Sequence, residues 1–287
     1  MKRIFLAGAA LAAFLGLAGA ALAAFLGLAG AATAAQTVKL GVVGSLYEDM
    51  WAPAKEELAR EGIDLELVHF SDYVTPNRAL SDGEIDLDGF QHDIYLQNEI
   101  KEYGYKLTAV GSTFIIPLNL YSRKVKAVAD LKDGDVIAIP NDPTNGGRAI
   151  KVLAAAGIVK LKDGAAFNPT KEDVEEYKVK VEISEMAANT IPSVLPDVAA
   201  AIINCGYAMD FGLTAEDVLF NDTSVSDREY WNIIVARTAD LEDPARVELF
   251  QRIVKAFQSP ATKAVFDGKF GGQFLPAGWG EDLLKRP

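Results

Sequence analysis

One short segment, residues 139–149, combines the residue types that proteins use to bind a small carboxylate. Its sequence is IPNDPTNGGRA, so Asn145, two consecutive glycines and Arg148 lie close together. An arginine guanidinium can hold a carboxylate through two parallel hydrogen bonds, and asparagine amides offer both donors and acceptors to the rest of a ligand. Asn, Pro, Gly and Asp are also ordinary turn residues, so the segment alone leaves a binding site and a solvated turn equally open.

The same segment is expected to join a strand to a helix. Residues 136–139 are apolar and β-prone, whereas residues 148–156 are Ala-rich and are followed by a glycine. The glycine pair then lies at the helix N-terminus, where backbone N–H groups without an intrahelical partner attract anions and the missing side chains let a ligand approach. Arg148 in the first helical turn is unfavourable for the helix itself, which favours an anion bound beside it.

Three further polar side chains fall at the ends of predicted strands or inside apolar runs. His92 follows one strand, Asn204 ends an apolar run and Asn232 lies within another. A buried amide without a partner costs roughly 1–3 kcal/mol, so each asparagine needs a hydrogen bond. Each position alone is more typical of a structural amide or a helix-capping histidine, but the three together favour a zwitterionic ligand.

Aromatic residues near these positions are candidates for the wall of an apolar subsite. Tyr73, Phe90 and Tyr95 are close to the polar candidates along the chain. Such rings could surround an apolar ligand side chain, although a group of aromatics is more often part of a core.

The chain alternates between strand-like and helix-like runs, which predicts an α/β fold with mostly parallel sheets. The predicted strands cover residues 38–43, 63–70, 85–90, 136–139, 178–183, 198–203 and 230–235. The predicted helices cover residues 48–60, 77–81, 93–103, 148–156, 244–258 and 260–266. Residues 160–176, which are acidic and Lys-rich, are expected to form a surface connection with a short helix.

This order predicts two α/β lobes that face each other across a cleft. We expect residues 37–119 with 233–287 to form one lobe and residues 120–232 to form the other, with a hinge between them. Ligands of open α/β sheets bind at the carboxyl ends of the strands, where the polar candidates lie.

The N-terminus has the features of a secretory signal. Lys2 and Arg3 precede an apolar run that ends in small residues, so residues 1–35 are interpreted as a signal peptide cleaved near Ala34 or Ala35. The segment AALAAFLGLAG at residues 9–19 is repeated unchanged at residues 20–30. The uncharged stretch is therefore long enough to span a bilayer, and a retained N-terminal anchor is the alternative.

Composition narrows the possible partners and the compartment. The chain has 28 Lys and Arg against 40 Asp and Glu, a net charge of −12, and no basic cluster, which argues against nucleic acid or anionic lipid as a partner. Cys205 is its single cysteine, so no cysteine at the cleavage site could carry a lipid. We therefore expect an exported periplasmic protein without a lipid anchor.

Five segments resemble the methionine-binding lipoproteins of the NlpA/MetQ type. They are FSDYVTPNRAL at 70–80, GEIDLDGFQHDIYL at 83–96, PNDPTNGGRA at 140–149, AIIN at 201–204 and YWNIIV at 230–235. Their order and spacing match over essentially the whole chain that follows the signal.

The resemblance implies a type II-like periplasmic-binding-protein fold. It also implies a function: capture of an amino acid, typically methionine, for the permease and ATPase subunits of an ABC importer. By the same resemblance, Arg148 would clamp the ligand carboxylate, and Asn145, Asn204 and Asn232 would hold the carboxylate and the ammonium. The side-chain subsite would consist of Tyr73, Phe90 and His92. No metal or cofactor is implied.

Three departures from the family pattern bear on specificity and anchoring. The lipid-bearing cysteine is absent, Asp88-Gly89 replaces a usual Asn-Ala before Phe-Gln-His, and residues 190–193 read TIPS where a PRSL-like stretch is common. A different amino acid or a methionine-containing peptide therefore remains an alternative ligand.

Two other classes of function would need different sequence features. An enzyme would need a nucleophile with a base or a metal cluster, but the chain has only His69, His92 and one cysteine, and no HExxH or GxSxG motif. We therefore do not expect an enzyme. A surface adhesin or interaction protein would need no small-molecule site and would be indifferent to substitution of Arg148.

Overall fold

The computed structural model of the protein describes residues 35–285. The predicted signal peptide, its duplication and the alternative of a retained anchor lie outside these residues, apart from Ala35. None of the helices formed by the described residues has the length and apolar character of a membrane span.

Two five-stranded sheets organise the described chain. The first has the order β2-β1-β3-β13-β4, formed by β2 (Ile63–Phe70), β1 (Gln36–Val43), β3 (Leu87–Asp88), β13 (Ile233–Arg237) and β4 (Leu107–Ser112). The second has the order β10-β7-β11-β6-β12, formed by β10 (Glu182–Met186), β7 (Val136–Pro140), β11 (Ala200–Asn204), β6 (Leu118–Tyr121) and β12 (Val218–Phe220). Two short antiparallel pairs complete the strands: β5 (Phe114–Ile115) with β14 (Leu275–Pro276), and β8 (Val159–Leu161) with β9 (Val174–Tyr177).

The expectation of mostly parallel sheets is confirmed, since four of the five strands in each sheet run in the same direction and one strand per sheet, β13 or β6, is antiparallel. In the first sheet β1 pairs in parallel with β2 and β3, whereas β13 is antiparallel to β3 and β4. In the second sheet β7 pairs in parallel with β10 and β11, whereas β6 is antiparallel to β11 and β12. Hydrophobic periodicity marks a strand but not its direction, and β6 and β13 are the first strands after the chain passes from one sheet to the other.

The helices are amphipathic and cover the sheets. They are α2 (Tyr47–Arg60), α3 (Thr75–Ser81), α4 (Asp93–Tyr103), α5 (Pro143–Ala155), α6 (Ile191–Val194), α7 (Cys205–Asp210), α8 (Pro244–Phe257) and α9 (Pro260–Gly268). In α2 the buried residues Met50, Trp51, Ala54 and Leu58 recur every three or four positions, which places them on one face.

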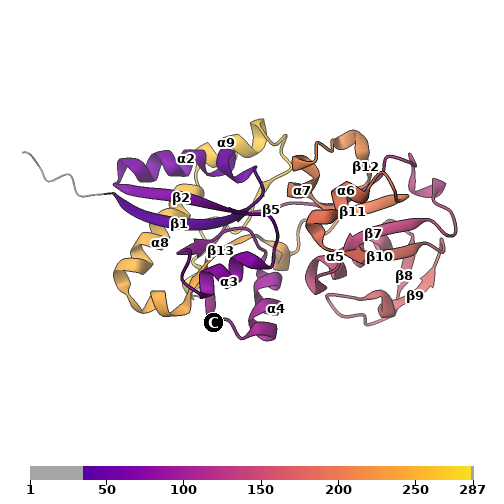
Figure 1. The fold of residues 1–287 in the computed structure, drawn as a ribbon, viewed down its shortest axis with the longest axis horizontal. Coiled ribbons are helices and arrows are strands. Elements are labelled where there is room, and N and C mark those ends of the chain that lie inside the picture. Colours follow the sequence, from indigo (N-terminus) through magenta and orange to yellow (C-terminus); the bar gives the residue numbers. More distant parts are fainter. Residues whose placement is uncertain (1–34, 286–287) are drawn as a thin grey trace, which may run out of the picture. The chain divides into compact units, whose positions relative to one another are not determined.

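Each sheet has its own hydrophobic core. Leu40 from β1, Trp51 from α2 and Phe257 from α8 are fully buried in the first core. Ile139 from β7 and Leu153 from α5 are fully buried in the second. In Figure 1 the middle of the chain, from magenta to orange, forms the second sheet, and the yellow C-terminal helices return to the first.

Several predicted elements differ from the observed ones. The helix expected at residues 148–156 begins earlier, at Pro143, and the strand expected at 178–183 is β10, which begins at Glu182. The connection at 160–176 contains only a single 3₁₀ turn, Lys171–Asp173, between the strands of a hairpin. The last predicted strand begins at Ile233, so the residue before it belongs to the preceding loop.

Candidate functional site

A pocket brings together all seven residues predicted for the site. Its wall contains Tyr73, Phe90, His92, Asn145, Arg148, Asn204 and Asn232. These residues are far apart in the sequence. They lie in strands, helices and loops that are connected to one or the other of the two sheets. Their placement in one wall makes a common role possible, while the role of each residue toward a ligand stays a prediction.

Strand ends explain how these residues meet. His92 follows β3 and caps α4, and Asn204 is the last residue of β11. Asn232 lies before β13 rather than inside it, but β13 is antiparallel to β3, so the start of one lies beside the end of the other. An isolated antiparallel bridge between His92 and Asn232 fixes this contact.

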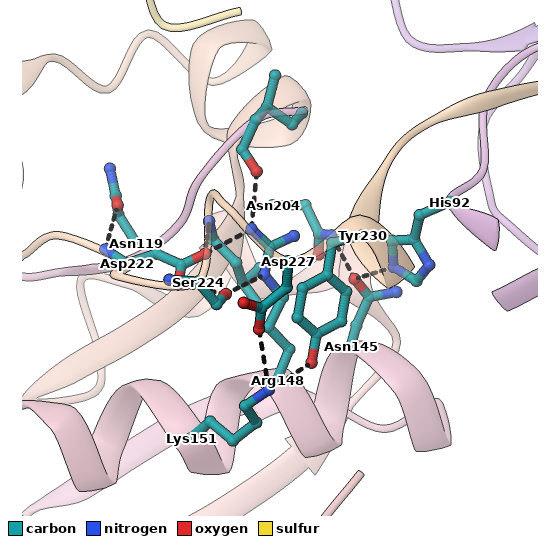
Figure 2. Close-up of polar contacts among 12 residues, drawn as sticks. His92, Asn119, Asn145, Arg148, Lys151, Asn204, Asp222, Ser224, Asp227 and Tyr230 are labelled. Carbon is teal, nitrogen blue, oxygen red and sulfur yellow. Dashed lines mark hydrogen bonds and ion pairs between the residues drawn. The ribbon is translucent and has the colours of Figure 1, made fainter. Parts of the chain in front are cut away.

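Arg148 is buried and already has several partners. Its Nε donates to Ser224 Oγ at 3.1 Å, and its Nη2 donates to the Ile116 carbonyl at 2.9 Å and pairs with Asp222 Oδ2 at 2.5 Å. The guanidinium carbon lies 4.3 Å from the centre of the Tyr230 ring (Figure 2). Only Nη1 has no partner among residues 35–285, so the expected two-armed grip on a carboxylate is not available in this geometry.

The helix N-terminus and its glycines differ from the prediction. Asp142 caps α5, accepting from the backbone N–H groups of Thr144 and Asn145 at 3.2 and 2.9 Å, so these donors are not free for an anion. A Cβ on Gly146 would lie 2.8 Å from the Pro140 carbonyl oxygen, and one on Gly147 would lie 2.7 Å from the Cα of Asn168. The glycines are therefore required by protein packing rather than by ligand approach.

Three of the predicted polar side chains form a hydrogen-bonded group (Figure 2). Asn145 Oδ1 accepts from Asn204 Nδ2 at 2.8 Å and lies 3.4 Å from His92 Nε2. Asn145 Nδ2 donates to both carboxylate oxygens of Asp142, at 3.1 and 3.0 Å. The buried Oδ1 of Asn204 has no partner among the described residues. A buried acceptor of this kind needs a donor, which a ligand in the pocket can supply.

His92 is neutral in this environment. Burial is the main cause that lowers its pKa to about 3, with the positive charge of Arg148 second. His92 Nδ1 accepts from the backbone N–H of Tyr95 at 3.2 Å, so the ring proton is assigned to Nε2, which faces Asn145. The histidine can therefore donate a hydrogen bond without adding charge to the pocket.

The predicted aromatic wall is present and includes one residue that sequence reasoning missed. The Tyr73 ring is stacked 5.9 Å from the Phe90 ring, and Tyr95 meets Phe90 edge to face at 6.0 Å. Tyr207, from α7, lies 5.0 Å from Tyr73 and also lines the pocket. Its position three residues after Asn204, on the helix that Asn204 caps, is the signal that could have identified it.

Asp222, Ser224 and Tyr230 around Arg148 were also missed. No motif marks Asp222 or Ser224, and Tyr230 lies in the YWNIIV segment without being singled out, because only the fold brings these three residues to α5. Cys205 lies in the pocket wall, and burial raises the pKa of its thiol to about 12, so it stays protonated and is a poor nucleophile. No group of side chains within residues 35–285 has the composition of a metal site.

The fold and the pocket define a small-molecule binding protein in which polar groups converge beside an aromatic wall. The chain belongs to the NlpA lipoprotein family, whose match covers residues 38–278. The sequence resemblance is thereby confirmed.

Named relatives support the same assignment. The D-methionine-binding lipoprotein MetQ of Salmonella typhi is 43% identical over 240 residues, which cover 80% of this chain and 86% of that protein. The protein of the same name from Escherichia coli K12 is 43% identical over 242 residues, with the same two coverages.

Solved structures confirm the expected fold. A nutrient binding protein from Burkholderia cenocepacia bound to methionine has a TM-score of 0.77 and 36% identity, covering 84% of this chain and 99% of that one. The substrate binding protein of a methionine transporter from Streptococcus pneumoniae has a TM-score of 0.79 and 32% identity, covering 84% and 95%. The chain therefore has the α/β fold of periplasmic substrate-binding proteins.

Proposed function

We propose that this protein captures an amino acid, with L-methionine as the ligand, and delivers it to an ABC importer. One observation carries the proposal: the wall that holds Arg148, whose contacts within residues 35–285 are made by Nε and Nη2, also holds the unpartnered Oδ1 of Asn204. The first is a donor for a carboxylate and the second an acceptor for an ammonium, which are the two charged groups of an amino acid. The names of the MetQ relatives and the methionine-bound structure support methionine in particular.

The aromatic part of the pocket suits a thioether side chain. Tyr73, Phe90 and Tyr207 place rings around one end of the pocket. A flexible methionine side chain would gain sulfur–aromatic contacts of about 0.3–1.5 kcal/mol there. His92, which lies edge to face with Tyr95, belongs to the same subsite. Asn145 and Asn232 complete the polar end, and we assign no catalytic role to any of these residues.

The ligand would be enclosed by two lobes that close on a hinge. Residues 37–119 with 233–287 form one proposed lobe, and residues 120–232 form the other. The arrangement of the two sheets supports this division, because the second sheet draws its strands from residues 118–220, and only the first two residues of β6 fall outside the proposed second lobe. The closed form would then dock on the permease subunits of the importer, whose ATPase subunits lie on the other side of the membrane.

The proposed location is the periplasm. The signal-like N-terminus supports export, and a solved relative from Coxiella burnetii is named a periplasmic substrate-binding protein of an ABC transporter. MetQ relatives are named lipoproteins, whereas this chain has its single cysteine at position 205. We therefore propose a mature protein without a lipid anchor.

Replacement of Arg148 by lysine tests the proposed site. Arg148→Ala would leave the buried Asp222 without its partner and destabilise the fold. Lysine keeps the positive charge but lacks the Nη1 hydrogens. Because charge-assisted hydrogen bonds contribute roughly 1.5–3 kcal/mol, we expect Arg148→Lys to weaken L-methionine binding roughly ten- to 150-fold in calorimetric titration of the ligand-free protein.

Arg123→Lys is the matched control, because Arg123 pairs with Asp217 at a solvent-exposed position. This variant should bind L-methionine like the wild type. A folded Arg148→Lys protein with unchanged affinity would refute the site. Wild-type protein that binds no amino acid would favour an adhesin or interaction protein. Preference for another amino acid or a methionine-containing peptide would change only the ligand assigned to the pocket and leave its role in binding unchanged.

A further inference from the structure

The positive charge of Arg148 is matched by a buried negative charge that the ligand does not supply. Nη2 of Arg148 lies 2.5 Å from Oδ2 of Asp222, and the two side chains are only 4% and 1% exposed. A buried charge pair at this distance is strongly coupled, because little water screens it. The positive charge of Arg148 is therefore already balanced by the negative charge of Asp222 before a ligand binds.

Both carboxylate oxygens of Asp222 already accept hydrogen bonds from the protein, so neither is available to a ligand. Its Oδ2 also accepts from the backbone N–H of Leu118 at 3.0 Å, while its Oδ1 accepts from Ser224 N and Oγ at 2.8 and 2.7 Å. Its own backbone N–H donates to Asn119 Oδ1 at 2.9 Å (Figure 2). This side chain acts on a ligand through its charge and through Arg148, not by contact.

The other ionisable groups around the pocket add little net charge inside it. Asp88, beneath the pocket wall, is fully buried, and burial raises its pKa to about 8, so it is largely protonated at pH 7. His92 is neutral, as described above. Asp142 lies at the positive end of the α5 dipole, which offsets its charge. Asp210 lines the rim, where it is exposed to solvent and accepts hydrogen bonds from Ser45, so its field inside the pocket is screened.

We propose that Asp222 is a specificity-determining residue that restricts the pocket to ligands without net charge. This inference rests on the proposed function and deepens it. A zwitterion brings equal and opposite charges and fits a balanced site. A carboxylate without an ammonium would leave an excess negative charge buried beside the Arg148–Asp222 pair, which is unfavourable in a poorly solvated pocket. The substrate class is then the α-amino acids with neutral side chains, and simple carboxylates are rejected.

The test compares two ligands that differ in net charge. L-Methionine is a zwitterion, and 4-(methylthio)butanoate has the same side chain and carboxylate but no ammonium. Calorimetric titration at pH 7 should give the wild type a preference for L-methionine of roughly 100-fold or more. Asp222→Asn leaves Arg148 unbalanced, so the same preference should shrink by about tenfold or more, as expected for one unit charge within about 12 Å of the ligand ammonium at an effective dielectric constant of about 20.

The asparagine variant preserves most of the local hydrogen bonds. An amide oxygen in the place of Oδ2 still accepts from Arg148 Nη2 and from the Leu118 N–H. Only the side facing Ser224 changes, because an amide NH₂ cannot accept from the Ser224 N–H. A change in the ligand ratio can therefore be attributed to the charge.

Two control variants separate charge from structure. Ser224→Ala removes the hydroxyl that bridges Arg148 and Asp222 but keeps both charges, so it should weaken both ligands and leave their ratio unchanged. Asp163→Asn removes one negative charge from an exposed turn and should match the wild type for both ligands.

Each outcome is decisive. A ratio in Asp222→Asn within about twofold of the wild-type ratio would overturn the inference while the proposed function stands. Wild-type protein that binds no amino acid would instead overturn the proposed function itself. If Asp222→Asn does not fold, the affinities of the wild-type protein for the two ligands provide the test. Affinities within about fivefold of each other would contradict a charge-balanced pocket. Rejection of 4-(methylthio)butanoate would support it.

Discussion

Asp88 is a fully buried carboxyl group beneath the pocket wall. Its Oδ1 accepts from Gln91 Nε2 at 2.9 Å, and its Oδ2 has no partner among the described residues. Gln91 also exchanges two hydrogen bonds with Asn77, at 2.9 and 2.6 Å. This buried group holds the segment that carries Phe90 and His92. By the resemblance given in the sequence analysis, the family usually has asparagine here, which would place an ionisable group of this chain where the family has a neutral one.

Burial raises the pKa of Asp88 from 3.8 to about 8, against a smaller lowering effect of the Gln91 hydrogen bond. The folded state therefore holds this proton more tightly than the unfolded state. The stabilisation from protonation is fully present below about pH 4, is lost progressively as the pH rises toward 8, and changes no further above that value.

Asp88→Asn should remove this pH dependence. The free energy of unfolding of the variant, minus that of the wild type, should increase between about pH 4 and pH 8 and then level off. Urea unfolding at a series of pH values measures the difference, and the exposed Asp163→Asn serves as the control. A difference that is constant across this range would show that Asp88 is not a buried neutral acid.

At the residue scale, the sequence identified the pocket residues but not their partners. Arg148 and the asparagines stood out because polar side chains interrupt apolar runs. Asp222 and Ser224 lie in a loop of ordinary turn residues, and only the fold brings them to Arg148. The sequence suggested that Arg148 binds a carboxylate through two hydrogen bonds. It did not indicate that Nε and Nη2 of Arg148 already bind Ser224, Ile116 and Asp222.

Helix α7 connects the pocket to contacts at its rim. Asn204 caps this helix, Tyr207 follows in its middle, and Asp210 ends it. The Asp210 carboxylate accepts from the backbone N–H and hydroxyl of Ser45, at 3.2 and 2.5 Å. The hydroxyl of Tyr207 donates to the Ser71 carbonyl at 3.3 Å. These bonds join α7 to the loops that follow β1 and β2, so they hold the two sheets together beside the pocket.

Loss of the Asp210–Ser45 contact should speed ligand release. Both residues are exposed, so the contribution is modest, and we expect Ser45→Ala and Asp210→Asn each to raise the L-methionine dissociation rate roughly three- to tenfold. Both variants remove the hydrogen bond from the hydroxyl to the carboxylate, while the backbone N–H of residue 45 can still donate in Ser45→Ala, so the double variant should be no worse than Asp210→Asn alone. Stopped-flow measurement of dissociation provides the rates.

Ser193→Ala is the control for this pair, since the Ser193 hydroxyl donates to the Thr190 carbonyl within its own turn. Its dissociation rate should equal that of the wild type. Additive effects of the Ser45 and Asp210 substitutions would mean that the two residues act separately and do not form a contact that retains the ligand.

At the element scale, the sequence predicted the helices and the mostly parallel strands, but not the single antiparallel strand of each sheet. Helix α4 and strand β2 match their predicted bounds. The start of α5 was placed too late because Pro, Thr and Asn read as a turn, although Asp142 as the cap and Pro143 at the first helical position are typical helix-start signals. The capped start also explains why this helix end is not available to an anion.

At the scale of the whole molecule, the chain leaves the first sheet, builds the second, and returns. β13 inserts between β3 and β4, and α8 and α9 then pack into the first core. The alternation of elements predicted the α/β class, and the order of the family motifs predicted the fold. The exact hinge could not be read from sequence, because the crossing segments are short strands and loops without a composition of their own. The lobe boundaries at 119/120 and 232/233 stay predictions.

The most direct test of the proposed function is to identify what the protein carries. Mass spectrometry of the small molecules released on denaturation of the purified mature protein, followed by titration of the ligand-free protein with L-methionine, measures both occupancy and rebinding. The proposed function predicts methionine in the extract and tight rebinding. A protein that releases no amino acid and shows no heat of binding with any of them would contradict it and point to an interaction protein instead.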